Sequence, residues 1–294
     1  MNKNLTRNAN GKKHLFYLLV LFVSFLFNHT STLAQELPYA NLSISDGLED
    51  MVIFDIEQDD QGFLWMTTRT GINRFDGSRF WTYNRSHGLP HNLVRDLHKA
   101  EDGTLWAASE AGLSWFDGQK FQSVSTDIWP THVSGRVLKE ASDGTIWVAT
   151  YGMGLVHIKP GKTPEIIKVY DKLSVFPIVR IRSLMIDNNG DIWAGDSRQV
   201  IKINKDKQIT TYDLHEASSE IRTIFQNIDG EIWVGTRQGA AVFDGNSFVP
   251  LEFDIDLSQQ TINSITLDNQ QHIWISSRDF GAYEFNQNRL LAKH

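Results

Sequence analysis

The chain has 294 residues, of which 41% are hydrophobic and 21% charged, so it can bury a sizeable core and a disordered class is excluded. Its net charge is −7, and because the first 34 residues hold four cations and no acid, residues 35–294 carry −11. Such an acidic body argues against nucleic-acid and anionic-membrane partners. The absence of cysteine excludes disulfides, thiolate metal sites and a thiol nucleophile.

The first 34 residues predict a secretory signal peptide. A basic segment precedes the apolar run Leu15–Phe27, and small residues follow up to Ala34, after which we expect cleavage. The thirteen apolar residues would reach about 20 Å as a helix, short of the ~30 Å hydrocarbon core of a bilayer, although an uncleaved anchor is the alternative. No later segment is apolar enough to span a membrane. We therefore expect a mature chain of residues 35–294 that is periplasmic or secreted.

Tryptophan reveals an internal repeat in residues 35–294. Six tryptophans are separated by 41, 41, 46, 40 and 41 residues, and we expect all six in the core: Trp65, Trp106, Trp147, Trp193, Trp233 and Trp274. A turn such as Asp102-Gly103 precedes nearly every one, Leu or Ile comes directly before it, and a Phe-Asp-Gly or a relative of it closes most units. The 46-residue spacing marks an insertion around Glu165–Phe176.

Each unit predicts four short strands. An apolar residue lies nine positions before every tryptophan and indicates a first strand, and the Asp-Gly pair suits a two-residue hairpin after it. The tryptophan lies on the second strand, and the Phe-Asp-Gly ends the third. A period of 40–45 residues with four strands is typical of a β-propeller blade. We therefore expect an all-β chain, a β-propeller of six four-stranded blades.

The start of the repeat region indicates how the ring closes. Tyr39–Leu48 align with Phe80–Leu89, which follow the first complete unit, so the chain begins with a fourth strand that has no first three. We expect Leu42–Ile44 to join the last blade, Ile262–Phe285, as its outer strand, because closure protects sheet edges. The alternative is an incomplete seven-bladed ring.

The motif D-x-x-G-x-[LI]-W-[small]-T…G-L…F-D-G, with Gly88-Leu89-Pro90-His91-Asn92 leading into the next unit, resembles the two-component regulator propeller repeat. The resemblance covers about residues 39–288. It implies a periplasmic ligand-sensing propeller, as in the sensor half of hybrid two-component systems of Bacteroidetes that sense polysaccharide fragments, and it implies no catalytic residue. Because no kinase or receiver motif follows, we expect the chain to signal through a membrane kinase or partner domain.

Arginine suggests the ligand site. Arg69, Arg237 and Arg278 lie four residues after their tryptophans and Arg198 lies five after, all in loops between the second and third strands. Such loops share one face of a propeller, and we expect these four arginines to form an anion-recognising rim with the aromatic residues Tyr151, Phe280 and Trp129. Guanidinium groups suit carboxylate or sulfate, so an acidic oligosaccharide or another small anionic ligand is the expected partner.

A second arginine set begins the first strands, eleven residues before the tryptophan: Arg95, Arg136, Arg182 and Arg222. For this set we favour pairing with acids of a neighbouring blade, such as Asp55 or Asp96, as a scaffold role.

Chemistry other than binding has little support in the sequence. The histidines are scattered without H-x-x-x-H spacing, no nucleophile elbow occurs, and we expect no metal site, no cofactor and no enzyme activity. Two alternatives remain. One is a lyase resembling streptogramin B lyase, for which His91 or His132 with Glu49, Glu110 or Glu220 are the candidates. The other is a protein-binding scaffold propeller.

Overall fold

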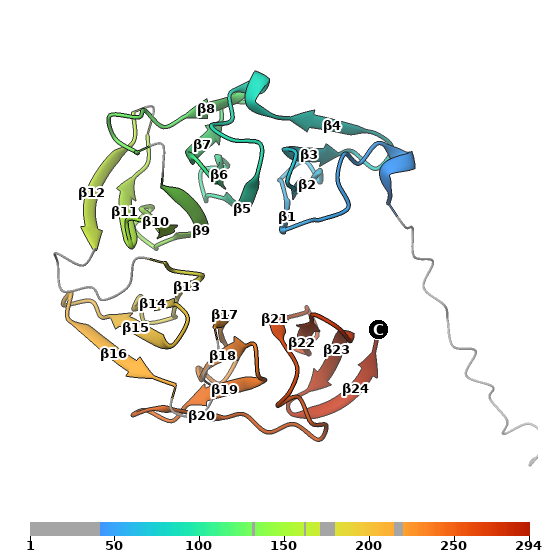
Figure 1. Ribbon diagram of the computed structural model, residues 1–294, viewed down its shortest axis with the longest axis vertical. Coiled ribbons are helices and arrows are strands. Elements are labelled where there is room, and N and C mark those ends of the chain that lie inside the picture. The colour runs from blue at the N-terminus through green and yellow to red at the C-terminus, as the bar shows by residue number, and fades with distance from the viewer. Residues whose placement is uncertain (1–41, 131–132, 162, 171–179, 215–219) are drawn as a thin grey trace, which may run out of the picture. The chain divides into compact units, whose positions relative to one another are not determined.

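A computed structural model describes residues 42–294 apart from 131–132, 162, 171–179 and 215–219, and these residues form one compact unit. Within it, six antiparallel sheets of four strands follow one another around a ring, and the first strand of each sheet is innermost (Figure 1). Each first strand contacts the first strand of the next sheet, from β1 through β21. The predicted all-β propeller of six four-stranded blades is therefore confirmed. Residues 1–34, predicted as a signal peptide, lie outside the described residues.

The strands run in meander order within each blade. Blade 1 consists of β1 (Asp55–Gln58), β2 (Leu64–Thr67), β3 (Ile72–Phe75) and β4 (Phe80–Tyr83), and blade 2 of β5 (Val94–Lys99), β6 (Leu105–Ser109), β7 (Gly112–Phe116) and β8 (Phe121–Ser123). Blade 3 consists of β9 (Ser134–Glu140), β10 (Ile146–Tyr151), β11 (Leu155–Lys159) and β12 (Glu165–Tyr170), and blade 4 of β13 (Ser183–Ile186), β14 (Ile192–Gly195), β15 (Gln199–Ile203) and β16 (Ile209–Asp213). Blade 5 consists of β17 (Ile221–Gln226), β18 (Ile232–Thr236), β19 (Ala240–Phe243) and β20 (Phe248–Pro250), and blade 6 of β21 (Ile262–Leu267), β22 (Ile273–Ser277), β23 (Gly281–Asn286) and β24 (Arg289–Lys293).

The turn before each tryptophan differs from the two-residue hairpin that we expected. In blade 1 the amide of Asp59 bonds to the carbonyl of Phe63, which leaves three residues in the loop, with Gly62 in the left-handed region at φ 87°. The Asp59 carboxylate accepts hydrogen bonds from the amides of Gln61 and Phe63 and from Nε1 of Trp65 at 2.8 Å. Asp59, six residues before the tryptophan, therefore stabilises both the turn and the position of the indole. A left-handed glycine after a type I turn is typical of such a three-residue loop.

The core lies between blades. Five of the repeat tryptophans are 2% exposed or less, and each lies in an apolar cluster with residues of the following blade. Trp65, for example, packs against Leu97 of β5 and makes edge contacts with Phe116 and Phe121. Since a single sheet cannot bury both its faces, this contact is what stabilises the stack of blades.

The expected closure by Leu42–Ile44 is wrong. The outer edge of blade 6 is occupied by β24, which pairs with β23, whereas Ile44–Asp46 form a short 3-10 turn (η1) that ends at Gly47. This turn matches Arg85–His87 (η2), which ends at Gly88 before blade 2. The alignment of Tyr39–Leu48 with Phe80–Leu89 therefore identified a turn that both segments share.

The junction between blade 6 and blade 1 differs from the other five. Ile56 of β1 is 54% exposed, whereas the five residues at the same position, nine before the tryptophan, are 7% exposed or less. Trp274 is half-buried, and among the described residues no apolar cluster joins blade 6 to blade 1. The junction between blade 6 and blade 1 therefore leaves exposed an apolar position that the other five junctions bury.

In the part of the chain that the structure describes, no helix is long and apolar enough to cross a membrane.

Candidate functional site

The two arginine registers meet on one face of the ring. Arg95 on β5 and Arg136 on β9 share the carboxylate of Glu110, with N–O distances of 2.8 and 3.2 Å to Oε1. Glu110 follows β6 and lies four residues after Trp106, at the position that Arg69 holds in blade 1. The loop register and the strand register therefore face each other, as the propeller geometry predicted.

A second carboxylate gathers three more arginines. Glu220, which precedes β17, lies 2.8 Å from Nη1 of Arg182, 3.5 Å from Nη2 of Arg222 and 3.3 Å from Nε of Arg237. Arg222 also donates from Nη1 to Oδ1 of Asn263 on β21 at 3.2 Å. This group connects blades 4, 5 and 6.

Tyr151, at the end of β10, connects the two groups. Its ring lies 4.3 Å from the guanidinium carbon of Arg136 and 5.2 Å from that of Arg182, which are cation–π distances. We call the continuous surface formed by these residues the arginine rim: Arg95, Glu110, Arg136, Tyr151, Arg182, Glu220, Arg222 and Arg237.

The arginine rim carries more positive than negative charge. Five guanidinium groups face two carboxylates, and burial together with the charge of Arg95 and Arg182 lowers the pKa of Arg136. Burial, followed by repulsion from Arg237, Arg182 and others, likewise lowers the pKa of Arg222. The cations therefore repel one another, and a bound anion would relieve that repulsion.

Two buried polar atoms of the rim lack a partner among the described residues. They are the hydroxyl of Tyr151 and Nε of Arg222. A buried donor without a partner costs about 1–3 kcal/mol of stability, and native proteins rarely keep one without a ligand or water to bind it. Both atoms belong to the face where the excess positive charge lies.

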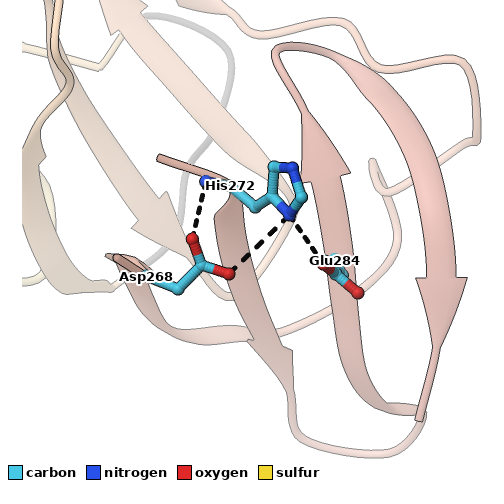
Figure 2. A group of neighbouring side chains, drawn as sticks. All are labelled: Asp268, His272 and Glu284. Atoms are coloured by element: carbon cyan, nitrogen blue, oxygen red, sulfur yellow. Dashed lines mark hydrogen bonds and ion pairs between the residues drawn. The ribbon is translucent and has the colours of Figure 1, made fainter. Parts of the chain in front are cut away.

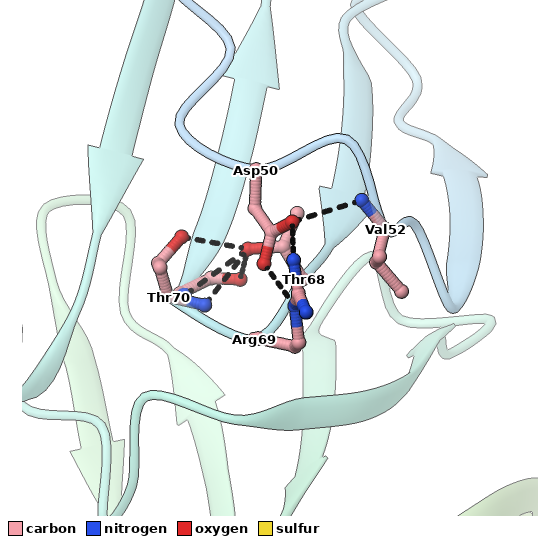
Figure 3. Close-up of polar contacts among 6 residues, drawn as sticks. Asp50, Val52, Thr68, Arg69 and Thr70 are labelled. Carbon is pink, nitrogen blue, oxygen red and sulfur yellow. Dashed lines mark hydrogen bonds and ion pairs between the residues drawn. The ribbon is translucent and has the colours of Figure 1, made fainter. Parts of the chain in front are cut away.

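Arg69, predicted for the rim, binds an acid of its own blade. Nε and Nη2 of Arg69 donate to the two carboxylate oxygens of Asp50 at 2.7 and 2.6 Å (Figure 3). Asp50 is only 5% exposed, and burial by itself raises the pKa of a carboxyl group. The hydrogen bond from Arg69 outweighs this and lowers the pKa of Asp50 to about 2. The planar guanidinium is thus already used in a bidentate pair.

The other predicted ligand residues lie in different surroundings. Arg237 is part of the arginine rim, whereas Arg198 and Arg278 are exposed. The amide of Arg198 donates to Oδ1 of Asp196, and the amide of Arg278 donates to the carbonyl of Thr261. Phe280 is exposed, with the ammonium of Lys293 5.3 Å from its ring. Trp129 is 1% exposed in the core between blades 2 and 3 and donates to the carbonyl of Val133, so it does not face the rim.

The expected pairing of the strand arginines with acids of a neighbouring blade is found for Arg136 with Glu110 and for Arg182 with Glu220. Arg95 and Arg222 pair with the same two acids within their own blades, so Asp55 and Asp96 are the wrong acids. Asp55 accepts a hydrogen bond from the amide of Leu97 at 2.9 Å, and Asp96 from the amide of Leu138 at 2.7 Å. These carboxylates bind β1 to the backbone of β5 and β5 to the backbone of β9. The lyase candidates Glu110 and Glu220 are bound to arginines, and His132 lies outside the described residues.

Sequence reasoning missed one group of side chains. Asp268, His272 and Glu284 of blade 6 bring together donor atoms that lie within 4.8 Å of one another and could hold a metal ion. Spacing motifs did not reveal it, because Glu284 on β23 is twelve residues from His272 in the turn before β22. A groove of about 900 Å³ lies elsewhere, between β19, β20 and the segment 250–259, and the rim's residues do not line it.

Comparisons with known proteins support the repeat. Residues 47–70 match the model of the two component regulator propeller. The chain is 36% identical over 67 residues to "Histidine kinase P4" of Formosa agariphila, a match that covers 23% of this chain and 5% of that protein.

Solved structures are similar over most of the chain. The extracellular domain of the hybrid two component system BT3049 from B. thetaiotaomicron has a TM-score of 0.73 and 25% identity, covering 85% of this chain and 36% of that one. Virginiamycin B lyase from Staphylococcus aureus has a TM-score of 0.63 and 13% identity, covering 81% and 83%, which shows the fold alone. The chain spans about a third of the BT3049 domain. In its repeat and its structure, this chain is similar to the two-component regulator propeller and to the extracellular domain of a hybrid two component system.

Proposed function

We propose that the chain is a non-enzymatic, extracytoplasmic ligand-sensing propeller that binds an anionic ligand, an acidic oligosaccharide, at the arginine rim. The observation that supports this most is the shortage of acids: five arginines on two carboxylates, with the Tyr151 hydroxyl and Arg222 Nε unpartnered among the described residues. The family supports a sensor role, since BT3049 is described as a hybrid two component system.

Carboxylate or sulfate groups of a sugar would complete the rim. Each could accept from guanidinium N–H groups that Glu110 and Glu220 leave free, and such charge-assisted bonds contribute about 1.5–3 kcal/mol when partly desolvated. Tyr151 would add its hydroxyl. Binding would tie blades 3, 4 and 5 together, because Arg136 lies on β9, Arg182 directly precedes β13 and Arg222 lies on β17. A change in how these blades pack could reach a membrane kinase or partner domain as the signal.

The test is a calorimetric titration of uronic-acid and sulfated oligosaccharides, with neutral oligosaccharides of the same length, at two salt concentrations. We expect saturable binding of an anionic sugar that weakens with salt. Tyr151→Phe removes only the hydroxyl and should weaken binding about fivefold, and Arg237→Ala about tenfold or more.

Arg79→Ala is the matched control, because it removes the same charge at an exposed turn of blade 1 outside the rim. Its affinity should equal that of the parent. Equal affinities for all three variants, or equal binding of charged and neutral sugars, would contradict the proposal. Recovery of a cleaved sugar after incubation would support the lyase alternative instead.

A further inference from the structure

Blade 6 departs from the other blades at two positions beside its tryptophan. One is the residue two before the tryptophan, and the other is the residue opposite the tryptophan on the third strand. In blade 3 these are Thr145 and His157, which share a hydrogen bond of 2.7 Å. In blade 4 they are Asp191 and Lys202, an ion pair of 2.7 Å.

In blade 6 the same two positions hold His272 and Glu284, which also form a pair, with Nδ1 of His272 2.8 Å from Oε1 of Glu284. Asp268 brings a third donor, because its Oδ2 lies 3.7 Å from the same Nδ1. Figure 2 shows the imidazole pointing between the two carboxylates. Hydrogen bonds hold Asp268 in place, since its Oδ2 also accepts from Nε1 of Trp274 at 3.0 Å and its Oδ1 from the amide of His272.

A second imidazole lies beside this group. His294 follows β24 and is held by two backbone hydrogen bonds with Ala282, at 2.8 and 3.1 Å. Its ring stacks on Trp274 with centroids 4.9 Å apart, and its Nε2 lies 3.5 Å from Oε2 of Glu284. The turn before β22 supplies Asp268 and His272, and β23 supplies Glu284, so a rigid sheet and its turn position three donor groups.

We propose that Asp268, His272 and Glu284 form a Zn²⁺ site on blade 6. Their donor atoms lie within 4.8 Å of one another. Ligands about 2.0–2.2 Å from a tetrahedral ion lie about 3.4 Å apart, and the distances of 2.8 and 3.7 Å from Nδ1 of His272 to the two carboxylates bracket that value. An imidazole nitrogen with two carboxylate oxygens suits zinc, whereas calcium and magnesium favour oxygen ligands alone.

The place of the site suggests what the ion does. It lies beside Trp274, the one repeat tryptophan that no apolar cluster of the described residues covers. The ion would link the turn between β21 and β22 to β23, and so hold these strands of blade 6 together. Its role is therefore structural, and it is independent of the arginine rim.

The experiment is a titration of ZnCl₂ into the chelator-treated chain, followed by calorimetry and by the emission of tryptophan. We expect one ion per chain, a rise in Tm and a change in Trp274 emission. His272→Ala and Glu284→Gln should each weaken binding about tenfold or more and abolish the Tm rise, because each removes a ligand.

His157→Ala is the matched control, since it removes a half-buried histidine from the equivalent place in blade 3. It should bind zinc like the parent. Circular dichroism without zinc confirms that each variant is folded. Unchanged zinc affinity in folded His272→Ala and Glu284→Gln, or weak binding that does not saturate in the parent, would overturn the proposal.

Discussion

Truncation of the apolar residue nine before the tryptophan should have very different effects in blade 1 and blade 2. Leu97 is 4% exposed and packs against Trp65 between the blades, whereas Ile56 is 54% exposed on the first strand of blade 1. Leu→Ala in a core lowers the free energy of unfolding by about 2–5 kcal/mol. Full burial of an isoleucine contributes about 1.5–3 kcal/mol, so Ile56→Ala, which removes a half-exposed side chain, should cost about 1 kcal/mol.

The assay is urea unfolding of the purified chain, with Leu138→Ala as a second buried site because Leu138 is fully buried at the same position in blade 3. Leu97→Ala and Leu138→Ala should lower the unfolding free energy by similar amounts, at unchanged m-value, and Ile56→Ala by much less. A loss for Ile56→Ala as large as for Leu97→Ala would show that blade 6 covers blade 1 and would refute the open junction.

Two further predictions concern a buried acid and a strained glycine. Burial raises the pKa of Asp96 to about 8. The folded chain therefore holds a proton that the unfolded chain has lost, and the unfolding free energy should fall as pH rises from about 4 to about 8. Asp96→Asn, whose amide oxygen can still accept from Leu138, should flatten this dependence in urea melts, and a slope equal to the parent's would contradict the assignment. Gly88 has φ 94°, and a Cβ there would lie 1.8 Å from the carbonyl oxygen of Phe121, whereas one at Gly77, φ 95°, meets nothing within 4 Å. Gly88→Ala should thus lower Tm far more than Gly77→Ala, and equal shifts would show that φ alone decides.

The blades could be predicted because their signals are local and repeated. One tryptophan per unit, with the turn before it and the apolar residue nine before it, predicts the four-stranded sheet. The role of Asp59 in holding Trp65 is also local, although only the structure showed it. The predicted closure by Leu42–Ile44 was wrong because no motif in residues 289–294 indicates a strand. These residues form β24 because they pair with β23.

The candidate site was predictable only in part. Propeller geometry places the arginines eleven residues before the tryptophan and those four after it on one face, but it does not determine which acids they bind. The arginine registers could be read from their spacing to the tryptophan. Glu220 could not be assigned, since it binds three arginines that come from two blades. Trp129 was misplaced because a loop tryptophan and a core tryptophan look alike in sequence, and burial against blade 3 separates them.

Hydrogen exchange with and without a saturating acidic oligosaccharide tests the arginine rim most directly. Amides around Glu110, Tyr151 and Arg237 should exchange more slowly in the complex, because the ligand would close the loops that carry them. The account predicts protection there and none in the segment 250–259, which lines the groove of about 900 Å³ beside β19 and β20. Protection confined to that groove, or no protection of the three loops at saturation, would contradict it.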